Sequence, residues 1–255
     1  MKIAIFGDSF AHTEPHNESR AWYTYVKDQG YDVTNFGRAG SSLYYSYKEY
    51  LKHYKSFDKC IFLVTNWGRF HLPQLKMPHW PGIQQIEGAL SDPDLPNQDR
   101  KVLASLYNWC IFARDDLQEI QHHELMLADI LHKNSNTLLI PCFNYEMSRM
   151  QQECSLMDLH QIDMDYYKID WQDSGKKWHR KPLRPGGREL RACHMNDENN
   201  IIFGNKLIEY INNNTFSLNI QDYTCSVKDV NYYFELADSK SVSSAAGNCH
   251  RYFCF

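Results

Sequence analysis

The stretch that decides the fold is the start of the chain, Met1-Lys-Ile-Ala-Ile-Phe-Gly-Asp-Ser-Phe10. Residues 3–6 are apolar and contain no turn former, which predicts a short buried β-strand. Gly7-Asp8-Ser9 follows at once, so this strand would end at a glycine and present a serine hydroxyl at the carboxyl edge of a sheet. Ligands of open α/β sheets bind at that edge. A plainer interpretation also stands, in which Ser9 only caps the helix that follows.

The next segments alternate between helical and strand patterns. Apolar residues at helical spacing predict helices over 14–30, 43–54 and 196–212, and apolar runs predict strands over 32–36, 59–64 and 137–141. Residues 98–133 are strongly helical and form either one long helix or two helices with a break near 114–116. This alternation predicts parallel strands joined by right-handed crossovers, and therefore an α/β fold.

Three stretches have little regular pattern. Residues 68–97 carry five prolines, at positions 73, 78, 81, 93 and 96, and are too long for an ordinary connection, so we expect a functional loop or lid there. Residues 151–193 contain a candidate fifth strand at 155–159, an acidic run, and then a basic run over 176–191. The tail, 215–255, alternates weakly and predicts a few strands added to the core.

Composition narrows the class of protein. The formal net charge of −4, from 27 basic and 31 acidic residues, argues against a protein that binds nucleic acid in general. There is no apolar run of about 18 residues to predict a transmembrane helix. The first residues enter a strand without the apolar region of a signal peptide, so we expect a cytoplasmic protein.

Cysteine usage points the same way. The eight cysteines are scattered and form no CxxC pair, so we expect reduced thiols. Cys249, His250 and Cys254 have poor spacing for a metal site, and we expect no metal there.

Four short motifs fall at the ends of the predicted elements. Gly7-Asp8-Ser9 follows the first strand, residues 37–40 follow the second, residues 65–66 follow the third, and residues 193–196 precede the last helix. In order, spacing and context these motifs resemble those of the SGNH (GDSL-type) hydrolase family of esterases and lipases, over residues 1–212. The first motif is the most specific, and the others gain weight from their order.

The resemblance implies an architecture. It predicts a flavodoxin-like three-layer sandwich around a parallel sheet of about five strands in the order 2-1-3-4-5. The hydrolase domain would occupy residues 1–214, and residues 215–255 would be a small C-terminal extension packed on the same domain.

The resemblance also implies a catalytic role for four residues. Ser9 would be the nucleophile and His194 the base that takes its proton. The backbone N–H groups of Ser9 and Gly40 and the side-chain amide of Asn66 would stabilise the oxyanion. Each residue has an ordinary alternative: Ser9 could be a helix cap, Gly40 a C-capping glycine, Asn66 a turn asparagine and His194 a solvated histidine. Asp8 is expected to be a structural carboxylate that hydrogen-bonds the turn.

The expected reaction is hydrolysis of a small acyl ester, such as an acetyl ester, through an acyl-serine intermediate and without a metal or organic cofactor. The aromatic and polar loop around Trp67, His79 and Trp80 suits a carbohydrate or another polar carrier better than a fatty chain. The substrate would therefore be a small-molecule or carbohydrate ester, with no membrane and no nucleic acid as partner.

Two positions depart from the family pattern. Val64 stands where a glycine is expected before Asn66, and Arg191 stands where the family has an acid three residues before the histidine. That acid normally holds the histidine in its working tautomer.

Three explanations for the missing acid are open. The acid could come from Asp173, Glu189 or Asp197, a main-chain carbonyl could orient the ring of a Ser-His dyad, or the protein could be inactive. We favour the dyad or a displaced acid. The alternative function is a catalytically degenerate binding protein of the same fold, whose basic run 176–191 would hold an anionic or carbohydrate ligand.

Overall fold

The computed structural model describes residues 1–11, 21–71, 83–142, 156, 195 and 197–223. These residues belong to two compact units, which are described separately. The first unit comprises residues 1–11, 31–71 and 83–142, and the second comprises residues 21–30, 156, 195 and 197–223. The division into a domain at 1–214 and an extension at 215–255 stays a prediction.

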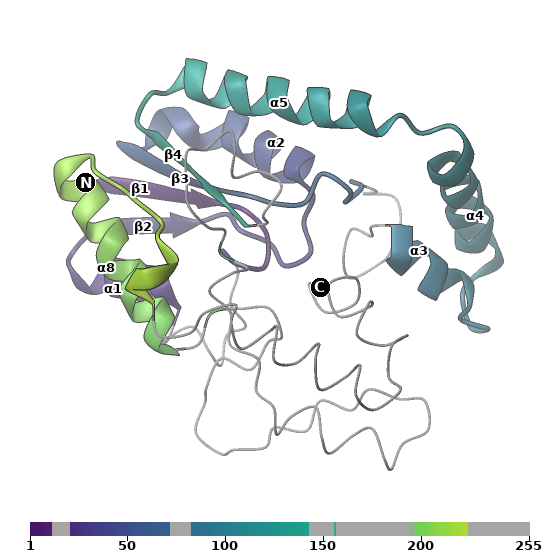
Figure 1. Ribbon diagram of the computed structural model, residues 1–255, viewed down its shortest axis with the longest axis horizontal. Helices are drawn as coiled ribbons and strands as arrows, with labels where there is room; N and C mark the ends of the chain where they lie inside the picture. The colour runs from purple at the N-terminus through teal and green to yellow at the C-terminus, as the bar shows by residue number, and fades with distance from the viewer. Residues whose placement is uncertain (12–20, 72–82, 143–155, 157–194, 196, 224–255) are drawn as a thin grey trace, which may run out of the picture. The chain divides into compact units, whose positions relative to one another are not determined.

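A four-stranded parallel sheet organises the first unit (Figure 1). Its strands are β1 (Lys2–Phe6), β2 (Asp32–Asn35), β3 (Lys59–Val64) and β4 (Thr137–Pro141). They lie in the order β2-β1-β3-β4, and all the pairs are parallel. This confirms the α/β fold and the first four positions of the expected strand order. Of the fifth strand expected at 155–159 the structure describes only Leu156, and that residue has a 3-10 conformation rather than a strand conformation.

The strands form where the sequence has continuous apolar runs, because parallel strands are covered on both faces. All six residues of β3 are buried, as are the last four residues of β1. Phe6 in β1 lies beside Phe62 in β3, with ring centroids 6.2 Å apart. The core of this unit is therefore centred on β1 and β3, the strands whose ends carry Ser9 and Asn66.

Two helices pack along one face of the sheet, α2 (Leu43–His53) and α5 (Asp116–Lys133) (Figure 1). Tyr50 of α2 joins them to the core. Its ring meets Phe6 edge-on at 5.4 Å, and its hydroxyl donates to the carbonyl oxygen of Ile130 in α5 at 3.0 Å. The hydroxyl of this buried tyrosine is thus hydrogen-bonded to α5, while its ring packs against the core.

The predicted helical stretch 98–133 is two helices, α4 (Asn97–Phe112) and α5, which confirms the broken alternative. Asp115 caps α5, because its Oδ1 accepts from the backbone N–H groups of Leu117 and Gln118 at 2.9 and 3.3 Å. The expectation of a long irregular stretch at 68–97 was wrong in part, since α3 (Ile83–Leu90) lies inside it and packs against α4. Ile86 of this short helix is fully buried. The prolines on either side of the helix made this apolar position hard to recognise in the sequence.

In the second unit α1 (Trp22–Asp28) packs against α8 (Asp197–Asn213). The ring of Trp22 meets that of Phe203 edge-on at 5.2 Å. The described part of the tail, residues 215–223, contains a 3-10 turn at Ile220–Asp222 and none of the expected strands. Residues 14–20 of the first predicted helix, Asn196 and residues 224–255 lie outside the described residues.

No described helix has the length and apolar character needed to cross a membrane. Among the described cysteines, Cys60, Cys110 and Cys142 are buried free thiols, as expected for these three. Burial raises the pKa of the Cys60 thiol to about 11. The other cysteines, including Cys249 and Cys254, lie outside the described residues.

Candidate active site

The turn after β1 places Ser9 at the carboxyl edge of the sheet. Gly7 has a φ of 151°, and a Cβ there would come within 2.7 Å of the Leu63 Cβ, so only glycine lets β1 end this close to β3. The buried carboxylate of Asp8 accepts from the backbone N–H of Phe10 at 3.0 Å, which confirms its expected structural role. Ser9 itself has 3% of its surface exposed.

The turn after β2 brings Gly40 to the same edge. Gly40 has a φ of 70°, a conformation that favours glycine, and its N–H has no acceptor among the described residues. The hydroxyl of Ser41 donates to the carbonyl oxygen of Gly7 at 3.0 Å. This bond ties the loop that carries Gly40 directly to the loop that carries Ser9.

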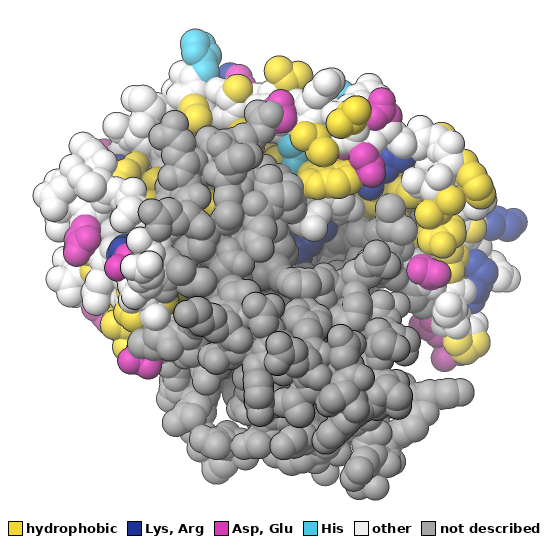
Figure 2. All heavy atoms as spheres, viewed as in Figure 1, with side chains coloured by type: hydrophobic (Ala, Val, Ile, Leu, Met, Phe, Trp, Pro, Cys, Tyr) yellow, Lys and Arg dark blue, Asp and Glu magenta, His cyan; other side chains and the backbone are white. Residues whose placement is uncertain are grey.

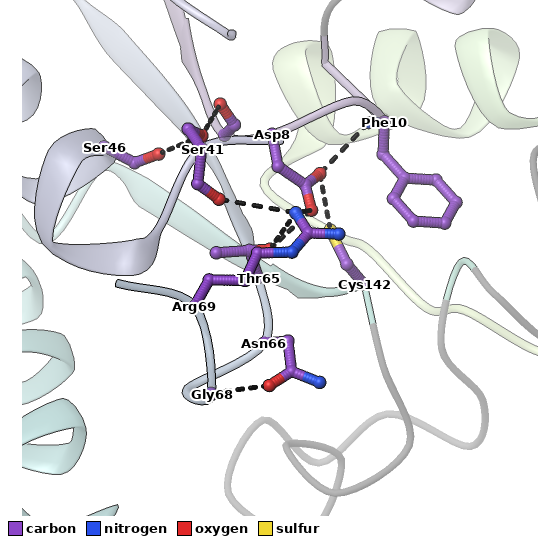
Figure 3. Close-up of polar contacts among 10 residues, drawn as sticks. Asp8, Phe10, Ser41, Ser46, Thr65, Asn66, Gly68, Arg69 and Cys142 are labelled. Atoms are coloured by element: carbon purple, nitrogen blue, oxygen red, sulfur yellow. Dashed lines mark hydrogen bonds and ion pairs between the residues drawn. The ribbon is translucent and has the colours of Figure 1, made fainter. Parts of the chain in front are cut away.

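The turn after β3 fixes the orientation of the Asn66 amide (Figure 3). Asn66 Oδ1 accepts from the backbone N–H of Gly68 at 2.6 Å, so Nδ2 must lie on the other side of the amide group. No described residue accepts a hydrogen bond from Asn66 Nδ2. The turn thus presents a neutral donor. Val64, the departure from the family pattern, is the last residue of β3 and is fully buried beside Pro141.

Arg69 is a buried cation at this edge that we did not predict from the sequence. Its Nη1 lies 2.8 Å from Asp8 Oδ2, 3.0 Å from Thr65 Oγ1 and 3.3 Å from the Ser41 carbonyl oxygen (Figure 3). The Arg69 side chain is 7% exposed and that of Asp8 is 0% exposed. A buried carboxylate requires a partner, and this requirement was the one available signal that some cation would lie here.

Two further groups complete the surroundings of Asp8. The Thr65 hydroxyl donates to Asp8 Oδ2, and the Cys142 thiol, just after β4, lies 3.8 Å from Oδ1. The carboxylate therefore contacts groups that follow β3 and β4 as well as its own turn. The Asp8 carboxylate thus connects several loops at this edge of the sheet, and both of its oxygens have partners.

A pocket of about 480 Å³ adjoins the loop after β3. Its aromatic lining comes from Tyr44 in α2 and from Trp67, Phe70 and His71 in that loop. His123 of α5 also lines it, is 6% exposed, and has no hydrogen-bond partner for Nδ1 among the described residues. Burial, helped by Arg114 and His122, lowers the pKa of His123 to about 4, so its imidazole is neutral at pH 7. The pocket therefore combines aromatic surfaces and the uncharged His123 with an arginine and a glutamate side chain, Arg69 and Glu119.

Arg114, between α4 and α5, packs against two of the aromatic rings that line the pocket. Its guanidinium lies 4.6 Å from the ring centroid of Trp67 and 5.0 Å from that of Phe70.

Hydrophobic side chains also gather on the outer surface, over α5 and α4 (Figure 2). Phe112 and Leu117, at the break between the two helices, are 83% and 72% exposed.

The expected base lies outside the described residues, as do Arg191, Asp173, Glu189, His79 and Trp80. The structure therefore brings Ser9, Gly40 and Asn66 to one edge of the sheet and leaves the position of His194 open. The residue after it is described. Asn200 of α8 donates to the Met195 carbonyl oxygen at 2.9 Å and accepts from the Trp22 N–H at 3.2 Å.

A scan against models of protein families gave no match, and a search of curated proteins gave none either. Solved structures gave distant likenesses. A protein from Desulfitobacterium hafniense DCB-2, described as a lipolytic protein of the G-D-S-L family, shares 12% identity over 63% of this chain and 86% of its own, with a TM-score of 0.27. The acetyl xylan esterase AlAXEase shares 12% identity over 83% of this chain and 100% of its own, with a TM-score of 0.32. An acetyl xylan esterase variant from Geobacillus stearothermophilus shares 13% identity over 62% of this chain and 83% of its own, with a TM-score of 0.27. At such TM-scores we draw no functional conclusion from them.

Proposed function

We propose that this chain is a serine hydrolase that cleaves small acyl esters through an acyl-serine intermediate on Ser9. The observation that carries the proposal is the meeting of three loops at one edge of the sheet. These loops hold the serine hydroxyl, a glycine N–H without an acceptor among the described residues, and an amide with a fixed orientation. A nucleophile with hydrogen-bond donors beside it supplies two of the three groups that acyl transfer needs, and the third is a general base.

In the proposed reaction His194 removes the Ser9 proton as the serine oxygen attacks the ester carbonyl carbon. The carbonyl oxygen becomes an oxyanion that accepts from the N–H groups of Ser9 and Gly40 and from Asn66 Nδ2. The intermediate then collapses, and the protonated His194 gives its proton to the departing alkoxide. Water attacks the acyl-serine by the same route and releases the acid.

The base works either as a dyad or with a displaced acid, because Arg191 occupies the place of the family acid. A main-chain carbonyl that accepts from the ring would fix the tautomer in a dyad, and a carboxylate would do so in a triad. Asp8 is not the displaced acid in this proposal, because its carboxylate is taken up by Arg69, Thr65 and the Phe10 N–H.

The surroundings favour a small acyl group on a ring-shaped polar carrier. Ser9 is almost fully buried, which favours access by a small acyl group. The neighbouring pocket offers aromatic rings for stacking. A carrier rich in hydroxyl groups can also donate hydrogen bonds to the Glu119 side chain that lines this pocket. A carbohydrate carrier meets these requirements, and an acetyl group is the acyl group that we propose.

The first prediction is that Ser9→Ala abolishes ester hydrolysis and leaves the fold intact, because the variant lacks the nucleophile. Turnover of an aryl acetate by the purified full chain and by the variant measures the effect, and thermal melts of both report the fold. Equal turnover by the two proteins would rule out Ser9 as the nucleophile. No turnover by either would favour the alternative, a binding protein on a degenerate hydrolase scaffold.

A further inference from the structure

A single nitrogen of Arg69, Nη1, contacts all three loops of the candidate site. Each of the three described groups that its Nη1 contacts belongs to the chain neighbour of one proposed oxyanion donor. Asp8 precedes Ser9, and its Oδ2 lies 2.8 Å from Arg69 Nη1. The Ser41 carbonyl follows Gly40, and its oxygen lies 3.3 Å from the same nitrogen. Thr65 precedes Asn66, and its Oγ1 lies 3.0 Å from it.

We propose that Arg69 is the positioning residue that sets the spacing of the oxyanion donors, by holding the loops after β1, β2 and β3 to one guanidinium nitrogen. This proposal rests on the proposed function, because it assigns to Arg69 a part in the same reaction. Arg69 is a positioning residue and not a catalytic residue in this proposal, since the described partners of its side chain adjoin the donors in the chain and are not the donors themselves.

The link from Arg69 to Asn66 runs through a single turn. The Arg69 N–H donates to the Asn66 carbonyl oxygen at 3.3 Å, and the Gly68 N–H donates to Asn66 Oδ1. These bonds make residues 66–69 one compact unit. A displacement of the Arg69 side chain from Asp8 therefore shifts the turn that orients the Asn66 amide.

The chemistry of the residue suits this role. A guanidinium remains charged at every working pH and presents several donors in a fixed plane, and it is less strongly hydrated than an ammonium group. Burial of Arg69 against Asp8 removes the competition from water, so the contacts stay in one geometry. Lysine would supply a charge on a different stem with a different donor geometry, and would not hold all three partners at these distances.

The test compares Arg69→Lys with the wild-type chain. Displacements on the order of 1 Å at a reaction centre cost about a hundredfold, so we expect kcat for an aryl acetate to fall about ten- to a hundredfold. KM should stay within about twofold, and the pH dependence of kcat should be unchanged, because the oxyanion forms only in the transition state and Arg69 moves no proton. An unchanged kcat, or a loss confined to KM, would overturn the positioning role.

A double-mutant cycle separates positioning from general damage. Asn66→Ala should lower kcat about a hundred- to a thousandfold, the usual loss for one oxyanion donor. If Arg69 acts through that donor, the loss in the double variant is at least about threefold smaller than the product of the two single losses. Losses that simply multiply would contradict the proposal.

A second variant and a control protect the test from a folding failure. Asp8→Asn combined with Arg69→Gln removes the buried charge pair together, so that no charge is left unpaired, and should show the same fall in kcat at unchanged KM. Arg100→Lys is the matched control. Arg100 also ties a loop to a helix, through the carbonyl oxygens of Leu90 and Asp92, but touches no site residue. It should keep the wild-type kcat, and an equal loss in this control would overturn the proposal.

The experiments distinguish failure of the positioning role from failure of the proposed function. A wild-type chain that hydrolyses the ester through Ser9, with Arg69→Lys equally active, overturns the positioning role alone. A wild-type chain that hydrolyses no ester overturns the proposed function, and the positioning role with it.

Discussion

Asp8 and Arg69 show how two residues organise the edge of the sheet where the site lies. The carboxylate is fully buried, and the guanidinium beside it is nearly so. Such a pair contributes little net stability, because desolvation offsets the attraction, but removing one partner leaves a buried charge. In our proposal the role of the pair is to position the loops, because Arg69 also contacts Ser41 in the loop after β2 and Thr65 in the loop after β3.

His123 offers a prediction at the same scale. Its pKa, lowered to about 4 by burial first and then by Arg114 and His122, lies below the unfolded value near 6.5. Below pH 6.5 His123 is therefore protonated in the unfolded chain and stays neutral in the folded chain. As a result, the free energy of unfolding falls as the pH drops towards 4. We expect this effect of His123 to lower the free energy of unfolding by on the order of 3 kcal/mol.

Urea unfolding at pH 7 and pH 4 measures this loss. We expect His123→Leu to lose less stability over the interval than the wild type, because it has no group to protonate. A smaller slope remains from His71, whose pKa is also lowered, by burial and then by Lys48 and Arg38. His132→Leu, an exposed position on the same helix, is the control and should keep the wild-type slope. Identical slopes for His123→Leu and wild type would show that this imidazole is not the cause.

Of the single residues in the site, the sequence indicated those that stand in short local motifs. Ser9, Gly40 and Asn66 each follow a recognisable strand, so their common edge could be predicted before their contacts were known. Arg69 could not be predicted, because its role depends on contacts with residues 61 and 28 positions away. A pairing of that kind leaves no local pattern.

At the scale of elements, the accuracy of prediction followed the strength of the pattern. The strands at 59–64 and 137–141 match the structure residue for residue, because each is a continuous apolar run that begins at a polar residue. The break between α4 and α5 was one of two open alternatives, and Asp115 decides it by capping the second helix. The helix α3 was missed because prolines flank it and its apolar face is short.

The pair of helices α1 and α8 supplies a prediction at this scale. Asn200 satisfies two backbone groups at once, the Met195 carbonyl and the Trp22 N–H. Asn200→Ala leaves both buried groups without this partner, so we expect the free energy of unfolding to fall by about 2–4 kcal/mol. Met195 adjoins the proposed base, and kcat should fall as well in the folded fraction.

Asn205→Ala is the matched control for this prediction, since it makes the same substitution at an exposed position of α8. Chemical denaturation of the full chain measures the stability of both variants, and aryl acetate turnover measures the activity. If the two alanine variants were equally stable, Asn200 would not be the link between α1 and the residue beside His194.

At the scale of the whole chain, the strand order places these loops at the edge where ligands of open α/β sheets bind. The chain passes from β1 to β2 on one side and returns to β3 on the other, so the order β2-β1-β3-β4 reverses direction between β1 and β3. Ligands of open α/β sheets bind outside the carboxyl ends of the strands at such a reversal. Ser9 follows β1 and Asn66 follows β3, which places the proposed nucleophile and one proposed donor on either side of it.

The central claim is that Ser9 is an activated nucleophile, and covalent labelling tests it most directly. The full chain is treated with a serine-reactive phosphonate, digested, and examined by mass spectrometry to locate the adduct. A catalytic Ser9 predicts a single adduct on that residue, formed more slowly in Asn66→Ala, because the bound phosphonyl oxygen needs the same donor as the oxyanion. A chain that stays unlabelled, or that carries the adduct on another hydroxyl such as that of Ser41, would contradict the claim.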